Sequence, residues 1–152
     1  MKPFRLVQVL AYRERTEATM QQQYADLVAQ VLMGITKLQA LTAEQQRLAG
    51  RLTMMQQSGQ WDAPSVDATL RYFERLNARV QEQIAEVDRL EQAKELARLS
   101  LVSAAQDHEV IERLKDRHDQ RQLQEDDRRE VKEADSMTAA RAIWRNHQHP
   151  QG

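Results

Sequence analysis

Apolar residues recur at alternating steps of three and four along the first part of the chain. This spacing is the heptad pattern of a helix that presents one narrow apolar stripe to a partner helix. Gly34 falls at a stripe position with Ile35 beside it, and Gln45 is a polar residue within the stripe. A polar residue there lowers stability and helps to fix the register of the two helices. The stripe consists of Met20, Tyr24, Leu27, Val31, Leu38, Leu41, Leu48, Leu52 and Met55.

A second stripe with the same spacing begins after residue 64 and weakens past Leu114. Towards its end, His108, Lys115 and His118 occupy positions that would otherwise be apolar. The preference for helix nevertheless continues, because the following residues are mostly good helix formers. This stripe consists of Phe73, Leu76, Val80, Val87, Leu90, Ala97, Leu101, Ala104 and Ile111.

Residues that break helices gather between the two stripes, in the segment SGQWDAP, residues 58–64. Pro64 suits the first turn of a helix, because its missing N–H would have no partner there. Either Asp62 or Ser65 could cap the amides of that turn. Two helices joined by so short a loop must lie side by side and antiparallel. With the reversal near residue 61, residue i lies opposite residue 122 minus i, roughly, so Leu10 faces the region of Glu112.

The sequence therefore predicts an all-α fold, a long antiparallel two-helix coiled-coil hairpin with an overhanging C-terminal helix. We expect one coiled-coil domain over residues 1–152, with helix 1 at about 4–57, the turn at about 58–64 and helix 2 at about 65–142. Residues beyond about 119 have no partner helix, and residues 143–152 are expected to form a flexible tail. Glu109 with Arg113, and Glu125 with Arg129, are pairs at a spacing that supports a helix.

Composition excludes several other classes of protein. Of the 152 residues 30% are charged, and four Gly and three Pro are too few for the many turns of an α/β or all-β fold. The absence of cysteine excludes disulfides and thiolate metal sites. We expect neither a transmembrane helix nor a signal peptide, because no apolar run has the required length. A net charge of −1 lacks the basic excess expected for nucleic-acid binding, and the expected location is the cytoplasm.

No motif predicts catalysis or a bound cofactor. The chain has no Gly-rich phosphate loop, and His108 and His118, ten residues apart, fall on different faces of a helix. They are better explained as polar stripe residues than as metal ligands. A two-helix rod also has little concave interior in which the pKa of a carboxyl group would be shifted. We therefore expect a non-enzymatic protein without cofactor or metal.

Two other features could serve protein–protein contacts. The segment EDDRREVKEAD, residues 125–135, is either a solvated helix face or a docking surface for an oppositely charged partner. A narrow stripe also leaves Tyr12, Tyr72, Trp61 and Trp144 available, and exposed aromatic side chains on a polar rod are candidate contacts. Trp61 has an alternative of equal weight, which is packing over the bend.

Three segments resemble the FliJ family of flagellar type III export proteins. They are MKPFRLVQVLAYRERTE at residues 1–17, LRYFERLNARVQEQI at 70–84 and IERLKDRHDQRQLQEDDRREVKEAD at 111–135. The resemblance extends over nearly the whole chain, in its length, the position of its turn and its charged C-terminal helix. It implies an antiparallel two-helix coiled coil similar to the central stalk of rotary ATPases.

The resemblance also implies a function, that of a central-stalk and chaperone-escort component of the flagellar export apparatus. The open end, where both termini meet, would bind the hexameric export ATPase, and the rod would contact the cytoplasmic part of the export gate and export chaperones. Such a protein would be monomeric when isolated and would lie in the cytoplasm, peripherally associated with the inner membrane at the flagellar base. The alternatives are the equivalent stalk protein of an injectisome and a generic coiled-coil adaptor.

Candidate contact residues follow from the same resemblance. Tyr72 and Leu76 match the segment after the turn and Gln83 follows at helical spacing, so these three are the candidates for binding the export gate or chaperones. Leu76 is also a stripe residue, so a position in the core is at least as well supported for it as a contact with a partner. The candidates for binding the ATPase are Phe4, Arg5, Leu6, Arg13, Arg15, Arg113, Arg117 and Arg121.

Overall fold

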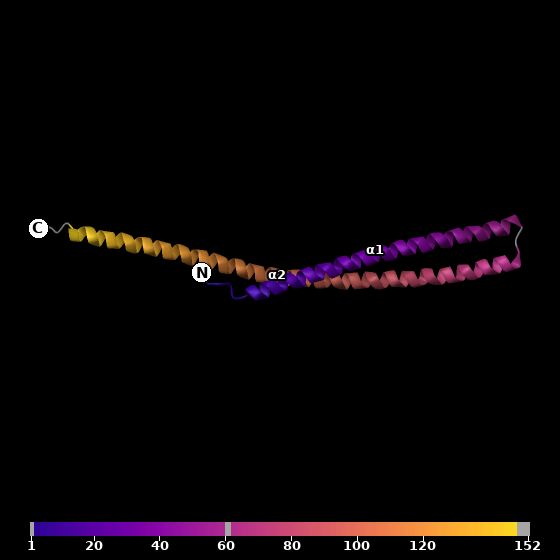
Figure 1. The fold of residues 1–152 in the computed structure, drawn as a ribbon, viewed down its shortest axis with the longest axis horizontal. Helices are drawn as coiled ribbons and strands as arrows, with labels where there is room; N and C mark the ends of the chain where they lie inside the picture. The colour runs from indigo at the N-terminus through magenta and orange to yellow at the C-terminus, as the bar shows by residue number, and fades with distance from the viewer. Residues whose placement is uncertain (1, 60–61, 149–152) are drawn as a thin grey trace. The chain divides into compact units, whose positions relative to one another are not determined.

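The structure, a computed structural model, describes residues 2–59 and 62–148. These residues form two α-helices, α1 (Val7–Ser58) and α2 (Ala63–Gln148), and contain no strand (Figure 1). The predicted all-α fold of two long helices packed against each other is therefore confirmed. Neither helix, over the part that is described, is long and apolar enough to cross a lipid bilayer.

The chain divides into two compact units. The hairpin unit comprises residues 16–104, and the terminal unit comprises residues 1–15 together with 105–152. Each unit contains a part of α1 and a part of α2. That residues 1–152 form a single domain stays a prediction.

In the hairpin unit, α1 and α2 lie side by side and run in opposite directions (Figure 1). Gln45 Nε2 donates a hydrogen bond to Asn77 Oδ1 over 3.1 Å, and Gln83 Nε2 donates one to Gly34 O over 3.0 Å. The contact on α1 thus moves towards the N-terminus as the contact on α2 moves towards the C-terminus. The pairing of residue 45 with residue 77 is the one that the rule of about 122 minus i predicts.

The core of the hairpin unit is made by the two predicted stripes. Leu76 is the most completely buried side chain, with 1% of its surface exposed. Every predicted stripe residue between Met20 and Ala104 is buried or half-buried, because steps of three and four keep one helix face turned towards the partner. The central cluster consists of Leu41, Leu48, Leu76 and Val80, with Leu38 and Phe73 packed against it.

The turn is bounded by residues suited to ending one helix and beginning the next. α1 ends at Ser58, and Gly59 follows with a φ of 64°, a left-handed conformation that glycine adopts without steric cost at the end of a helix. Asp62 precedes α2, and the hydrogen bond from the Ser65 side chain lowers the pKa of the Asp62 carboxyl below its usual value of 3.8. The Asp62 carboxyl also accepts a hydrogen bond from the backbone N–H of Ser65 in the first turn of α2, so Asp62 is the residue that caps α2. The predicted alternatives for Trp61 lie outside the described residues.

The helix ends differ from the expected bounds by a few residues. α1 begins at Val7 rather than about residue 4, and Val7 N donates to Phe4 O over 3.3 Å in a turn that precedes the helix. α2 continues to Gln148, six residues past the expected end at about 142, because residues 139–148 contain neither Gly nor Pro and several strong helix formers. Part of the expected flexible tail is thus helical, and residues 149–152 lie outside the described part.

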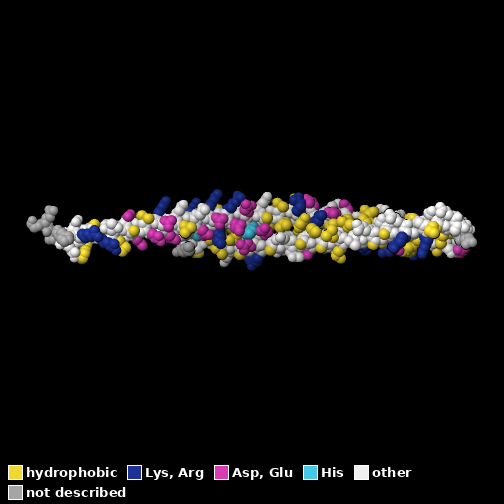
Figure 2. Space-filling view, turned by 90° about the horizontal axis from the view of Figure 1, so that it is seen from above, with side chains coloured by type: hydrophobic (Ala, Val, Ile, Leu, Met, Phe, Trp, Pro, Cys, Tyr) yellow, Lys and Arg dark blue, Asp and Glu magenta, His cyan; other side chains and the backbone are white. Residues whose placement is uncertain are grey.

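In the terminal unit, the start of α1 covers only the first part of the α2 segment. Every residue of α2 from Asp127 to Gln148 is exposed, so no described residue of the unit packs over this stretch. The predicted overhang of the C-terminal helix is confirmed. On the face shown in Figure 2, acidic and basic side chains are interspersed along this part of α2, and the large apolar side chains that it exposes are Val131, Met137, Ile143 and Trp144.

Candidate partner-binding surfaces

The first candidate surface is a hollow in the terminal unit, formed where the start of the chain lies against α2. The turn before α1 brings Phe4 onto α2, where its ring centroid lies 5.4 Å from that of His118, with the rings tilted by 56°. This arrangement is typical of packed aromatic rings. The hollow, here called the terminal hollow, is lined by Phe4, Arg5, Leu6, Leu114, Arg117, His118 and Arg121.

Three arginines give the terminal hollow a positive charge. Arg5, Arg117 and Arg121 are exposed and make no ion pair within the described residues. Arg117 and Arg121 are one helical turn apart and project from the same side of α2. His118 Nδ1, in the same hollow, lies 3.5 Å from Asp119 Oδ1. An aromatic ring beside several cations suits a partner surface that carries carboxylates next to apolar groups.

The remaining candidates for ATPase binding are engaged elsewhere. Arg13 Nη1 lies 3.2 Å from Asp107 Oδ2 and joins α1 to α2 within the terminal unit. Arg113 Nη2 lies 2.6 Å from Glu109 Oε1 on the same helix, and Arg15 is exposed but also has an interaction partner. The structure therefore brings Phe4, Arg5, Leu6, Arg117 and Arg121 together and leaves the other three arginines outside the hollow.

His108 lies among carboxylates of both helices where the apolar stripe weakens. Its Nε2 is 3.7 Å from Glu14 Oε1 on α1 and 3.8 Å from Glu112 Oε1 on α2, and 18% of its side chain is exposed. Polar contacts thus join the helices where few apolar residues remain. The sequence identified His108 as a stripe residue but not its neighbours.

His118 and Leu114 were missed as residues of the terminal hollow. The pairing rule would have found His118, because it places residue 118 opposite residue 4, roughly. The same rule places residue 108 opposite residue 14, roughly. Applied to the two histidines, that rule gives the observed contacts with Phe4 and Glu14. A polar residue in the stripe is therefore best interpreted together with the residue that faces it.

The three candidates for binding the export gate or chaperones do not form one exposed surface. Leu76 has 1% and Gln83 has 8% of its surface exposed, whereas Tyr72 has 40% exposed. The structure gives Leu76 the core position that the stripe indicated. Of the three side chains, Tyr72 alone is accessible to a partner while the hairpin is intact.

The Tyr72 hydroxyl donates a hydrogen bond to Glu44 Oε1 on α1. This bond raises the pKa of Tyr72 above its usual 10.0, while nearby Arg79 and Arg75 act in the opposite direction. A second hollow surrounds this contact and is lined by Glu44, Arg47, Leu48, Arg51 and Tyr72. We call it the tip hollow, because it lies in the part of the hairpin unit that approaches the turn.

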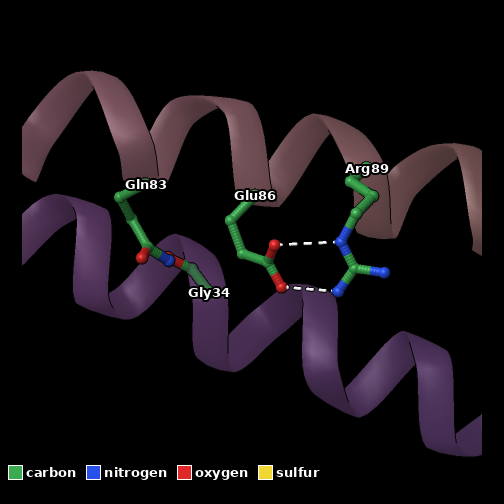
Figure 3. Close-up of polar contacts among 4 residues, drawn as sticks. All are labelled: Gly34, Gln83, Glu86 and Arg89. Carbon is green, nitrogen blue, oxygen red and sulfur yellow. Dashed lines mark hydrogen bonds and ion pairs between the residues drawn. The ribbon is translucent and has the colours of Figure 1, made fainter.

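Gln83 reaches from α2 to the α1 backbone at Gly34 (Figure 3). A Cβ at Gly34 would lie 3.2 Å from Val87 Cγ2 and 3.5 Å from Gln83 Nε2, so the glycine permits the two helices to approach closely here. Further along α2, Arg89 donates two hydrogen bonds to Glu86, of 2.9 and 2.6 Å, and these bonds lower the pKa of the Glu86 carboxyl. The Gln83 amide therefore joins the helices instead of facing a partner.

Within residues 2–59 and 62–148, no three His, Cys, Asp or Glu side chains are grouped so that they could hold a metal ion. The segment 125–135 is exposed at every position except Asp126, which is half-buried. Its two interpretations, a solvated face and a docking surface, both agree with this exposure.

Comparison with known proteins identifies the family. The family model described as "Flagellar FliJ protein" matches residues 1–148, which is nearly the whole chain and includes both helices. Comparison with curated proteins and with solved structures gives no match. With a two-helix hairpin and a match of this extent, the chain belongs to the FliJ family of flagellar proteins.

Proposed function

We propose that this protein is the central-stalk and chaperone-escort component of the flagellar type III export apparatus. Membership of the FliJ family makes it a flagellar protein related to export and places it in a family without enzymatic activity. In this role the terminal hollow binds the hexameric export ATPase, and the hairpin unit binds the export gate and export chaperones. The protein then acts by binding, and its chemistry is that of its exposed side chains.

The observation that carries this proposal is the group of unpaired cations around Phe4. Some exposed cations of the chain, such as those of Arg89 and Arg98, are held by a carboxylate three residues away, and others are unpaired but do not surround an aromatic ring in a hollow with two further cations. Arg5, Arg117 and Arg121 have no such partner within the described residues. Unpaired guanidinium groups retain their full capacity for bidentate hydrogen bonds to carboxylates, so they can contact successive subunits of an ATPase ring.

The hairpin unit contributes a different kind of contact. Tyr72 is the accessible residue among the three candidates, and we assign it direct contact with the export gate or a chaperone. Leu76 and Gln83 are assigned a positioning role, since the first packs in the core of the hairpin unit and the second joins the two helices at Gly34. We further propose that the isolated protein is a monomer and that it lies at the cytoplasmic face of the inner membrane at the flagellar base.

The test measures hexamer formation and ATP hydrolysis of the purified cognate export ATPase as this protein is added. The wild-type chain should raise both. Changing Arg117 and Arg121 together to Ala should raise the concentration needed for half-maximal stimulation about tenfold, because each lost ion pair at a surface contributes on the order of 0.7 kcal/mol. Circular dichroism should remain unchanged, since alanine is a good helix former.

A matched control is offered by Arg141 and Arg145, which have the same spacing on the same helix but lie outside the terminal hollow. Their double change to Ala removes the same charge and should leave stimulation close to the wild-type level. Equal losses in both variants would indicate general electrostatic attraction. No stimulation by the wild-type chain at saturation would refute the role in the ATPase ring.

A further inference from the structure

Two exposed arginines line the tip hollow. Arg47 and Arg51 are exposed and have no ion pair within the described residues. Elsewhere in this unit the exposed cations of Arg71, Arg89 and Arg98 are each matched by a nearby carboxylate. Lys37, Arg75 and Arg79 of the same unit also form no ion pair within the described residues, so Arg47 and Arg51 are distinguished by lining one hollow together.

The one acidic side chain that lines the tip hollow is already engaged. Glu44 accepts a hydrogen bond from the Tyr72 hydroxyl and forms no ion pair with Arg47 or Arg51 within the described residues. Arg75 and Arg79 act on Tyr72 from α2, which places two more cations near the same ring. The surface around Tyr72 is thus positive overall, and its lining also includes the Tyr72 ring and the edge of buried Leu48. Figure 2 shows Lys and Arg side chains next to hydrophobic ones near the turn.

We propose that the tip hollow binds an acidic helix of a partner protein. Arg47 and Arg51 are one turn apart on α1, so their Cα atoms are spaced by about 6 Å along the helix axis. Carboxylates four residues apart on a partner helix have the same spacing. Each can accept two hydrogen bonds from one guanidinium group, while an apolar residue between them contacts Tyr72 and Leu48.

A nucleic acid fits the tip hollow less well than an acidic helix does. Binding to a phosphate backbone requires cations along an extended track, whereas these arginines occupy a short hollow that also contains the carboxylate of Glu44. The inference rests on the proposed function only in taking the partner from the export gate or the chaperones. The chemistry of the hollow does not depend on that assignment.

The test uses the full chain and a fluorescein-labelled helical peptide that carries Glu at every fourth position. Binding is followed by fluorescence anisotropy at low and at raised salt. The peptide should bind at low salt and weaken as salt screens the charges, and a peptide with Gln in place of Glu should not bind. Changing Arg47 and Arg51 together to Ala should weaken binding about tenfold, and changing both to Lys should retain part of it, because lysine keeps the charge without the bidentate geometry.

The control variant is again Arg141→Ala with Arg145→Ala, which removes the same charge away from the tip hollow. An equal loss in this variant, or no binding of the Glu peptide by the wild-type chain, would overturn the inference. A single-stranded oligonucleotide that binds as tightly as the Glu peptide, and loses affinity in the same variant, would assign the hollow to nucleic acid instead.

The same variants separate this inference from the proposed function. Arg47→Ala with Arg51→Ala should still stimulate the export ATPase, since the tip hollow and the terminal hollow share no residue. If the wild-type chain fails to stimulate the ATPase but binds the Glu peptide, the stalk role fails and the acidic-helix site stands. If stimulation occurs without peptide binding, the reverse holds.

Discussion

Replacing Leu76 by Ala tests whether the core of the hairpin unit is as localised as the burial indicates. Leu76 has 1% of its surface exposed and packs in the cluster of Leu41, Leu48 and Val80. The change removes three carbon atoms, worth about 2.4 kcal/mol at ~0.8 kcal/mol per methylene. The cavity that remains adds to this loss, although a two-helix contact can partly close around it. We therefore expect the free energy of unfolding to fall by about 3 kcal/mol.

The assay is urea unfolding of the full chain followed by far-ultraviolet circular dichroism. Leu96→Ala is the matched control, because Leu96 lies on the same helix in the same unit but has 67% of its surface exposed. That change should alter the free energy of unfolding by no more than about 0.5 kcal/mol. Similar losses in the two variants would refute the reasoning, because stability would then not follow the buried stripe.

Two further changes test the polar contacts of the hairpin unit. Gln83→Leu should leave the free energy of unfolding within about 1 kcal/mol of the wild type or raise it, because the Gly34 carbonyl keeps its own helical hydrogen bond and a buried amide is removed. Urea unfolding measures this change. A loss as large as that of Gln83→Ala would contradict the prediction. Asp62→Ala should lower the melting temperature at neutral pH by removing the cap of α2. Because the pKa of Asp62 is lowered from 3.8, its ionised form stabilises the fold above that pH and the contribution is lost as pH falls through the lowered pKa. The deficit of the variant in thermal melts should therefore shrink in acid, and a deficit independent of pH would indicate a different role.

Much of the fold could be predicted because a coiled coil encodes its core in spacing alone. Leu76, Val80 and Leu90 were assigned to the stripe from steps of three and four, and all are buried. The reversal followed from the gathering of breakers before Pro64. The end of α2 was placed too early, because residues 143–148 carry no apolar stripe and their helix depends on local propensity and on continuity with the preceding turns.

Gly34 marks the limit of sequence reasoning about the core. In the sequence Gly34 is a stripe position without a side chain, and the structure shows a close approach there, at which Gln83 of α2 donates to the Gly34 carbonyl. A single stripe states which residues face the partner helix but not how near the partner comes. That distance depends on the shapes of side chains on both helices, which no spacing rule contains.

The candidate sites were predictable only where one pairing rule applied. The rule connects Phe4 with His118 and Glu14 with His108, so the terminal hollow was within reach of the sequence. The sequence indicates ion pairs only between residues close together on one helix. The ion pair of Glu109 with Arg113 forms as predicted, whereas Glu125 and Arg129 form no ion pair within the described residues. The contact of Arg13 with Asp107 joins residues far apart in the chain and needed the structure.

The uncovered end of α2 has a consequence for how that segment loses its order. A free peptide of the length of residues 127–148 would have to form its first turn at considerable cost, but here the preceding turns of the same helix already supply that nucleus. Unwinding can then proceed residue by residue from the C-terminal end, as in a zipper, without a shared cooperative step. The helical fraction should therefore fall gradually from Asp127 to Gln148. A partner that binds near Asp127 meets a helix already formed, whereas one that binds near Gln148 must help to form it.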